Sequence, residues 1–177
     1  MNPRRAIALF LFALVAVACN TSTTTPTPAP AATASPATGG GQCAPTDLAL
    51  VSGGWSAAAG SRGADVSVEN RGATACTLPA GPTVAVLDAG GTQLLEAGAT
   101  TNEPGPSLEP GAVATFTVLF SNWCDEGAAL PLHVALRAGD AAVPVPDLDL
   151  TAEDLPPCNG PGQQPELSAN PWEPVSG

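Results

Sequence analysis

Between residues 43 and 177, the hydrophobic positions recur every second residue, in short runs that glycine and proline interrupt. Residues 64–70 alternate alanine and valine with aspartate, serine and glutamate, and residues 112–120 place alanine, phenylalanine and valine on one face and threonine on the other. Alternation of this kind predicts strands with one buried and one solvated face, as in antiparallel sheets. Seven segments are predicted to form strands: 48–51, 64–70, 83–87, 92–96, 112–120, 130–137 and 143–150.

The residues between these segments specify turns and one sheet edge. Residues 88–91 are Asp-Ala-Gly-Gly, and glycine accepts the positive φ that a tight hairpin requires. Two prolines in residues 143–150 cannot donate ladder hydrogen bonds, so this strand is expected at a sheet edge. A short helical turn is expected at residues 151–155, with Thr151 as its cap. About seven short strands and many turn residues predict an all-β fold, an antiparallel, immunoglobulin-like β-sandwich.

The first eighteen residues have the pattern of a secretory signal. Two arginines precede an uncharged apolar run, residues 6–18, which is shorter than the about 20 residues that span a membrane. Small residues come directly before Cys19, as a signal peptidase requires. Residues 14–19, Leu-Val-Ala-Val-Ala-Cys, resemble the bacterial lipobox, so residues 1–18 are expected to be removed as a lipoprotein signal peptide and Cys19 to be acylated. The alternative is an ordinary signal peptide followed by an unmodified cysteine.

Residues 19–42 lack the side chains that build a core. After Cys19 the segment contains no charged or aromatic residue and no aliphatic residue larger than alanine. Such a chain cannot bury enough apolar surface to offset its ordering entropy. Its prolines favour extended polyproline II structure, at about 3.1 Å per residue. We therefore expect a lipid-anchored, disordered tether over residues 19–42 and a folded domain over residues 43–177.

The charge of the mature chain excludes several classes of partner. Removal of residues 1–18 leaves three arginines and no lysine against sixteen carboxylates, a formal charge of 3 minus 16, or −13. Nucleic-acid binding needs a basic surface that neutralises phosphates, and attraction to anionic lipid headgroups needs one too. Membrane contact is therefore expected only through the lipid on Cys19. Dispersed carboxylates are expected to keep the domain soluble and monomeric, with a divalent-cation site as the alternative.

Four cysteines lie in the domain, and an even number in an exported chain predicts two disulfides, for which three pairings exist. Cys43 precedes the first predicted strand and Cys76 follows the second, so antiparallel neighbours would bring both to one end of the sandwich. Cys124 follows one predicted strand, and Cys158 follows another two strands later. Both are therefore expected at the same end of the sandwich. Strand order thus predicts Cys43–Cys76 and Cys124–Cys158. The alternative, a zinc site of four thiolates, lacks any Cys-x-x-Cys pair.

Several short motifs in a fixed order resemble one protein family. The first is Cys-Ala-Pro-Thr-Asp-Leu at residues 43–48 and the last is Cys-Asn-Gly at residues 158–160. Between them lie the motifs at residues 58–61, 68–72, 76–79, 84–91, 108–112 and 124. Their order and spacing are similar to those of the family called domain of unknown function 4232, over nearly all of residues 43–172. The resemblance implies an exported or lipid-anchored bacterial protein with a spacer and a β-sandwich. It implies no functional residues, because the family has no established activity.

Few residues could carry catalysis. His133, the single histidine, is expected on the outer face of its strand, and no Gly-x-Ser-x-Gly motif supplies a nucleophile. Met1 is the single methionine and is lost with the signal, which excludes a His/Met copper site. We therefore expect no catalytic residue, no resident metal and no cofactor, and a chain that is not an enzyme.

Acidic residues that follow Cys124 are candidate ligand contacts. Asp125 and Glu126 directly follow Cys124 and, with Glu153 and Asp154, could gather near one disulfide as oxygen ligands for Ca²⁺. Against this, no loop has the Asp/Asn spacing of a dedicated calcium site.

The three tryptophans are expected to differ. Trp55 lies in a Gly-rich loop and is the one expected to be exposed, as a contact for a protein or glycan partner. Trp123 is expected to pack on the Cys124 bridge or the end of the core, and Trp172 to hold a C-terminal strand.

Together these patterns predict a non-enzymatic binding or structural protein, exported and lipid-anchored on the outer face of the cell membrane. Its partner is expected to be an envelope protein or a glycan. Two other classes stay open as alternatives. One is a hydrolase with a carboxylate site that no motif reveals, and the other is a carrier of Ca²⁺ or a small ligand.

Overall fold

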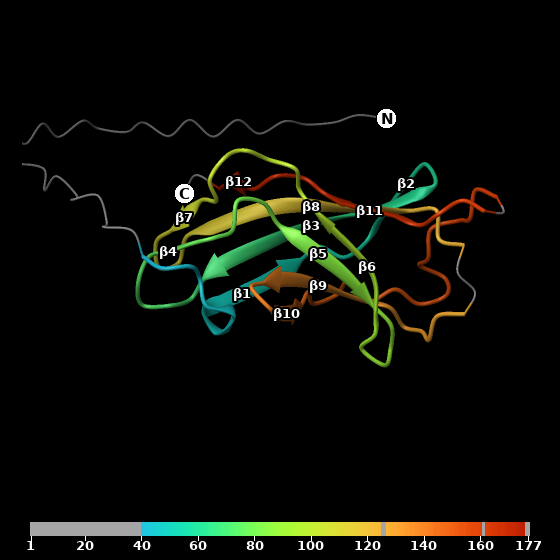
Figure 1. Ribbon diagram of the computed structural model, residues 1–177, viewed down its shortest axis with the longest axis horizontal. Coiled ribbons are helices and arrows are strands. Elements are labelled where there is room, and N and C mark those ends of the chain that lie inside the picture. The colour runs from blue at the N-terminus through green and yellow to red at the C-terminus, as the bar shows by residue number, and fades with distance from the viewer. Residues whose placement is uncertain (1–39, 125–126, 161, 176–177) are drawn as a thin grey trace, which may run out of the picture. The chain divides into compact units, whose positions relative to one another are not determined.

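The computed structural model describes residues 40–124, 127–160 and 162–175, so the predicted signal peptide, Cys19 and most of the predicted tether lie outside the described residues. The described chain forms antiparallel β-sheets that pack around one core (Figure 1), and this confirms the predicted all-β sandwich. The described part contains one short 3-10 turn, η1 (Pro45–Asp47). No helix in this part of the chain is long and apolar enough to cross a membrane.

Two sheets form the sandwich, and a small third pairing lies beside them. In the larger sheet the strand order is β1 (Leu48–Ser52), β3 (Ser61–Asn70), β8 (Val113–Ser121) and β11 (Glu166–Ala169), with β2 (Ser56–Ala58) on β3 and β12 (Glu173–Pro174) on β8. In the second sheet the order is β10 (Ala141–Pro144), β9 (His133–Ala138), β5 (Thr83–Leu87) and β6 (Gln93–Gly98). The third pairing joins β4 (Cys76–Thr77) to β7 (Ser107–Leu108).

The core lies between the inner faces of the two sheets. Val66 of β3 and Val84 of β5 have no solvent exposure, and each such side chain contributes about 1.5–3 kcal/mol when it is buried. Residues between the buried ones face outward. Thr117 of β8, for example, donates a hydrogen bond across the outer face to Asp65 of β3 at 2.7 Å. The period-two pattern therefore reports which face of β3 and β8 is buried, whereas in β5 and β9 the intervening Ala85 and Ala135 are buried as well.

Six of the seven predicted strands form within three residues of their expected bounds. The seventh prediction, residues 143–150, is wrong over most of its length, because only its first two residues belong to β10. β10 does lie at the edge of its sheet, as the prolines indicated. Beyond it, Asp147 has a positive φ of 59°, which an extended strand does not allow, and the chain leaves the sheet there.

The two predicted turns have different outcomes. The hairpin at residues 88–91 is confirmed: the Asp88 carboxylate accepts hydrogen bonds from the Gly90 and Thr92 N–H groups, both at 2.8 Å, and Gly91 has a φ of 81°. The segment 151–155 forms a hydrogen-bonded turn rather than a helix. Within it the Asp154 N–H group donates to Thr151 O at 3.0 Å, and the Thr151 side chain is not the expected cap, since it donates to the Asp154 carboxylate instead of accepting from a backbone N–H group.

Two disulfides join the strand ends, Cys43 to Cys76 and Cys124 to Cys158, and these are the pairs that strand order predicts. Beside the first, Cys43 N–H donates to Thr77 O and Thr77 N–H donates to Gly41 O, both at 3.0 Å. The start of the domain is thus paired with β4 and also linked to it covalently.

Asn70, at the end of β3, organises the loop that follows and has no solvent exposure. Its side-chain amide donates to the carbonyls of Thr74 and Leu108, both at 2.9 Å, and its side-chain oxygen accepts from the Gly72 N–H group at 2.9 Å. One buried side chain therefore satisfies three backbone groups from two separate segments.

Replacement of Asn70 by alanine should lower the free energy of unfolding by about 2–3 kcal/mol, because one buried and two partly buried backbone groups lose their partner. Urea denaturation of the two proteins measures this difference. The matched control is Asn102→Ala, at an exposed loop position, which should change stability by less than about 0.5 kcal/mol. Equal stability of Asn70→Ala and Asn102→Ala would contradict the assigned role.

Candidate functional site

The chain after β10 crosses from one sheet to the other, and we call residues 145–155 the strap. On the side of the second sheet, the Val145 N–H group donates to Val134 O at 2.9 Å. Leu132 and Leu150 exchange two backbone hydrogen bonds, of 3.0 and 2.8 Å. The strap is therefore held along β9 although only one of its residues forms a β-bridge.

Side chains of the larger sheet hold the other side of the strap. Ser52 Oγ donates to Pro146 O at 2.7 Å, and Arg62 Nε donates to Asp154 O at 2.7 Å. Between these bonds, the side chain of Leu148 is fully buried in the core. The strap thus connects the two sheets by hydrogen bonds and adds apolar side chains between them.

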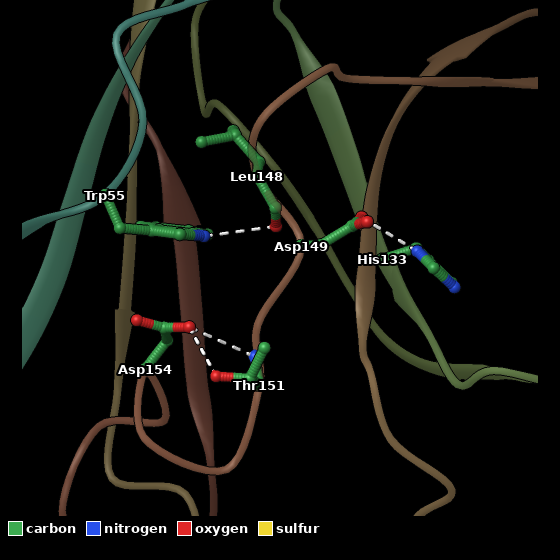
Figure 2. Close-up of polar contacts among 6 residues, drawn as sticks. All are labelled: Trp55, His133, Leu148, Asp149, Thr151 and Asp154. Carbon is green, nitrogen blue, oxygen red and sulfur yellow. Dashed lines mark hydrogen bonds and ion pairs between the residues drawn. The ribbon is translucent and has the colours of Figure 1, made fainter.

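Trp55 follows β1 and lies against the strap (Figure 2). Its Nε1–H donates to Leu148 O at 3.1 Å, and its ring is half-buried against the core. The expectation of an exposed tryptophan is therefore wrong. The physical reason is the turn before it, where Gly54 has a φ of 76° and directs the chain back onto the strap. A ligand contact at Trp55 stays a prediction.

The other two tryptophans are placed as expected. Trp123 is buried, with its ring edge-on to Phe120 at a centroid distance of 5.7 Å. Trp172 precedes β12 and is also edge-on, to Phe116 at 5.1 Å. Its Nε1–H donates to Pro79 O at 2.9 Å, so it holds the C-terminal strand against the rest of the domain.

His133 begins β9 and points to the outside of the sheet, as predicted. Its Nδ1 lies 2.8 Å from a carboxylate oxygen of Asp149 on the strap, and Figure 2 shows the second ring nitrogen directed away from Asp149. The two side chains are 38% and 59% exposed. A carboxylate on Nδ1 fixes the tautomer of a neutral imidazole and leaves Nε2 as a proton acceptor. The pair can therefore act as a weak general base toward a bound water or hydroxyl group.

Asp154 and Thr151 close the turn at the end of the strap. Thr151 Oγ donates to the Asp154 carboxylate at 2.6 Å, and the Thr151 N–H group donates to the same oxygen at 3.3 Å (Figure 2). These two hydrogen bonds, the hydroxyl first, lower the pKa of Asp154 below its ordinary value of 3.8, and the charge of Arg62 adds to the effect.

The carboxylates that were expected to gather near the second disulfide are only partly described. Asp125 and Glu126, the two candidate ligand contacts there, lie outside the described residues. Glu153 and Asp154 belong to the strap, where both backbone carbonyls accept hydrogen bonds from Arg62. In the described ranges, no three His, Cys, Asp or Glu side chains come close enough together to hold a metal ion.

All three arginines of the domain have partners. Arg62 binds strap carbonyls, Arg71 pairs with Glu69 at 3.2 Å, and Arg137 pairs with Glu96 at 3.0 Å. The Arg137 pair was missed from the sequence, because Glu96 is on β6 and Arg137 on β9, with β5 between them. Only the alternation of Arg137 and His133 on the outer face of one strand gave any signal of it.

Comparison with known proteins gives one match. A family model described as a domain of unknown function, DUF4232, matches residues 43–173. No curated protein and no solved structure matches the chain.

The pKa of Asp154 provides a test of the strap turn. Its folded-state pKa is lowered, so this carboxylate stabilises the fold above its ordinary pKa, and the contribution is lost as the pH falls through the lowered value. Thr151→Val removes the hydroxyl donor and should raise the pKa of Asp154 toward 3.8, as measured by NMR titration of the carboxyl carbon. Thr46→Val, at an exposed position, should leave that pKa unchanged. An unchanged pKa in Thr151→Val would show that the hydroxyl is not the cause.

Proposed function

The chain belongs to the DUF4232 family, and we propose that it is a lipid-anchored, non-enzymatic binding or structural module of the bacterial cell envelope. The observation that carries the proposal is the order of parts along the chain. An apolar signal ends at a cysteine, an uncharged Thr/Pro/Ala-rich segment follows, and a disulfide-linked β-sandwich begins at Cys43. A domain on such a tether works at a distance from the membrane that holds it.

The cysteines support export from the cytoplasm. All four cysteines of the domain are in disulfides, which persist in oxidising compartments and are rare in the reducing cytosol. Cys19 is the one cysteine left for acylation. Stable anchoring needs more than one acyl chain, since each buried methylene contributes only about 0.8 kcal/mol.

The chemistry of the domain supports binding over catalysis. Its cysteines are held in disulfides, and its single histidine is paired with Asp149 on the outer face, where both side chains are partly exposed to solvent. Catalysis generally uses a site that excludes water and sharpens electrostatic interactions. A binding or structural role needs neither.

A hydrolase is the second candidate, and one observation favours it. The contact of His133 Nδ1 with Asp149 is the arrangement by which a carboxylate orients a general-base histidine. In that reading His133 Nε2 would take a proton from water, and Asp149 would stabilise the imidazolium that forms.

Substitution of the acylated cysteine tests the anchor. Cys19→Ala should release the protein from membranes into the soluble extracytoplasmic fraction, because no other segment of the mature chain is expected to hold it there. Fractionation and immunoblotting measure the distribution. The control is Cys124→Ala with Cys158→Ala, which should stay membrane-bound. Continued membrane association of Cys19→Ala would refute the lipoprotein assignment.

Neutral substitutions separate the binding module from the hydrolase. His133→Gln, Asp149→Asn, and the double variant Asp125→Asn with Glu126→Gln should each complement a deletion strain as fully as the wild-type protein, because binding does not use their charge or acid-base chemistry. A hydrolase would give the deletion phenotype in at least one of them. The comparison is made at equal protein levels, so that instability does not imitate loss of activity.

A further inference from the structure

A polar groove lies on the second sheet, away from the strap contacts. It is a hollow of about 520 Å³, within the range of pockets that take small ligands. Its walls come from β5 and the segment before it, β6, β9, the turn between β9 and β10, and the start of the domain. The lining residues are Gln42, Pro79, Thr83, Glu96, Arg137 and Asp140, with Gly139 between the last two.

Arg137 is held in position inside this groove. Its Nε–H donates to Glu96 at 3.0 Å, and one terminal nitrogen donates to the side-chain oxygen of Gln93. The two side chains meet diagonally across β5: Glu96 lies opposite Ala85, and Ala85 lies opposite Ala135, two residues before Arg137. A guanidinium has five N–H donors, and the two hydrogen bonds described leave three for a ligand. Since the side chain is already ordered, binding would cost little additional rotamer entropy.

The groove offers both donors and acceptors around this arginine. The amide of Gln42 and the hydroxyl of Thr83 can donate or accept, and the carboxylates of Glu96 and Asp140 accept. A hydroxyl group also donates and accepts, so neighbouring hydroxyls on a ligand match this set. The positive charge of Arg137 is offset by Glu96, which leaves the groove without a net attraction for anions.

An apolar recess continues the groove inward. The two hollows share Gln42, Pro79, Arg137 and Gly139, and the recess adds Leu48, Leu136 and Trp172 among its walls. Its volume is about 30 Å³, which is room for one small group such as a methyl. Trp172 is fixed there by its hydrogen bond to Pro79 O. A ligand that fills both parts carries hydroxyls next to one small apolar substituent.

We propose that this groove binds a neutral saccharide, with its hydroxyls on Arg137, Glu96 and Asp140 and an acetamido methyl group in the recess beside Trp172. The formal charge of −13 on the mature chain disfavours acidic sugars by long-range repulsion. This inference rests on the proposed function and specifies the partner of the binding module as an envelope glycan.

Calorimetric titration of the purified full-length protein with three trisaccharides tests the proposal. The probes are the trimers of N-acetylglucosamine, of glucose and of galacturonic acid, which differ in the acetamido group and in charge. The N-acetylglucosamine trimer should bind about tenfold or more tighter than the glucose trimer, and the galacturonate trimer should bind weakest. Tightest binding of the galacturonate trimer, or binding of none of the three, would overturn the proposal.

Variants locate the site. Arg137→Met and Asp140→Asn should each weaken binding of the N-acetylglucosamine trimer about tenfold or more. Arg71→Met removes the same charge from an ion pair outside the groove and should leave binding unchanged. Asp140 lies in an exposed turn, so Asp140→Asn is expected to fold normally and still tests the site if Arg137→Met misfolds. Equal binding by Asp140→Asn and the wild-type protein, or an equal loss in Arg71→Met, would contradict the assigned site. Loss of the saccharide inference would leave the anchor test with Cys19→Ala unaffected.

Discussion

The hydrogen bonds that the strap makes to both sheets are the contacts on which the rest of the domain depends. A β-sandwich is open along its sides, and the strap lies across one of them, with Leu148 and Leu150 fully buried beneath it. Burial of this segment is possible because its carbonyls find donors. Pro146 O accepts from Ser52 of β1 and Leu148 O from Trp55 in the loop after β1, while Leu150 O accepts from the Leu132 N–H group directly before β9. Unpaired carbonyls in the same place would oppose burial.

The strap also determines what chemistry the outer face of β9 presents. His133, Ala135 and Arg137 share that face. The side chains of His133 and Arg137 each contact a carboxylate, and the two carboxylates come from different segments. Asp149 comes from the strap and Glu96 from β6. Ala135, between them, has no solvent exposure. The face is therefore divided into an open acid-base pair at one end and a recessed, preorganised arginine at the other, and the recessed end is the better place for a ligand.

The sequence was enough to predict six of the longer strands, because strand burial follows local alternation. Phe116 and Val118 could be assigned to one buried face from their spacing alone, and the cysteine pairs followed from strand order. The short strands β2, β4, β7 and β11 were not predicted, and the C-terminal strand expected beside Trp172 was given no bounds, since two to four residues give too little periodicity. The strap and the Arg137 contact were missed for another reason. Each depends on a tertiary partner far away in the chain, and the positive φ of Asp147 has no local signal beyond the residue type.

The first described residues of the domain contribute to the groove, and the proposed tether would join the domain at the same place. The ends of a domain fray unless they are tied down, and here the first described residues also line the groove. Gln42 contributes to both hollows, and it lies between Gly41, whose carbonyl accepts from Thr77, and the disulfide-linked Cys43. Opening of this end would remove one wall of the groove. The Cys43–Cys76 disulfide therefore does more than lower the entropy of the unfolded chain: it holds Gln42, which lines the proposed saccharide groove, in place at the start of the domain.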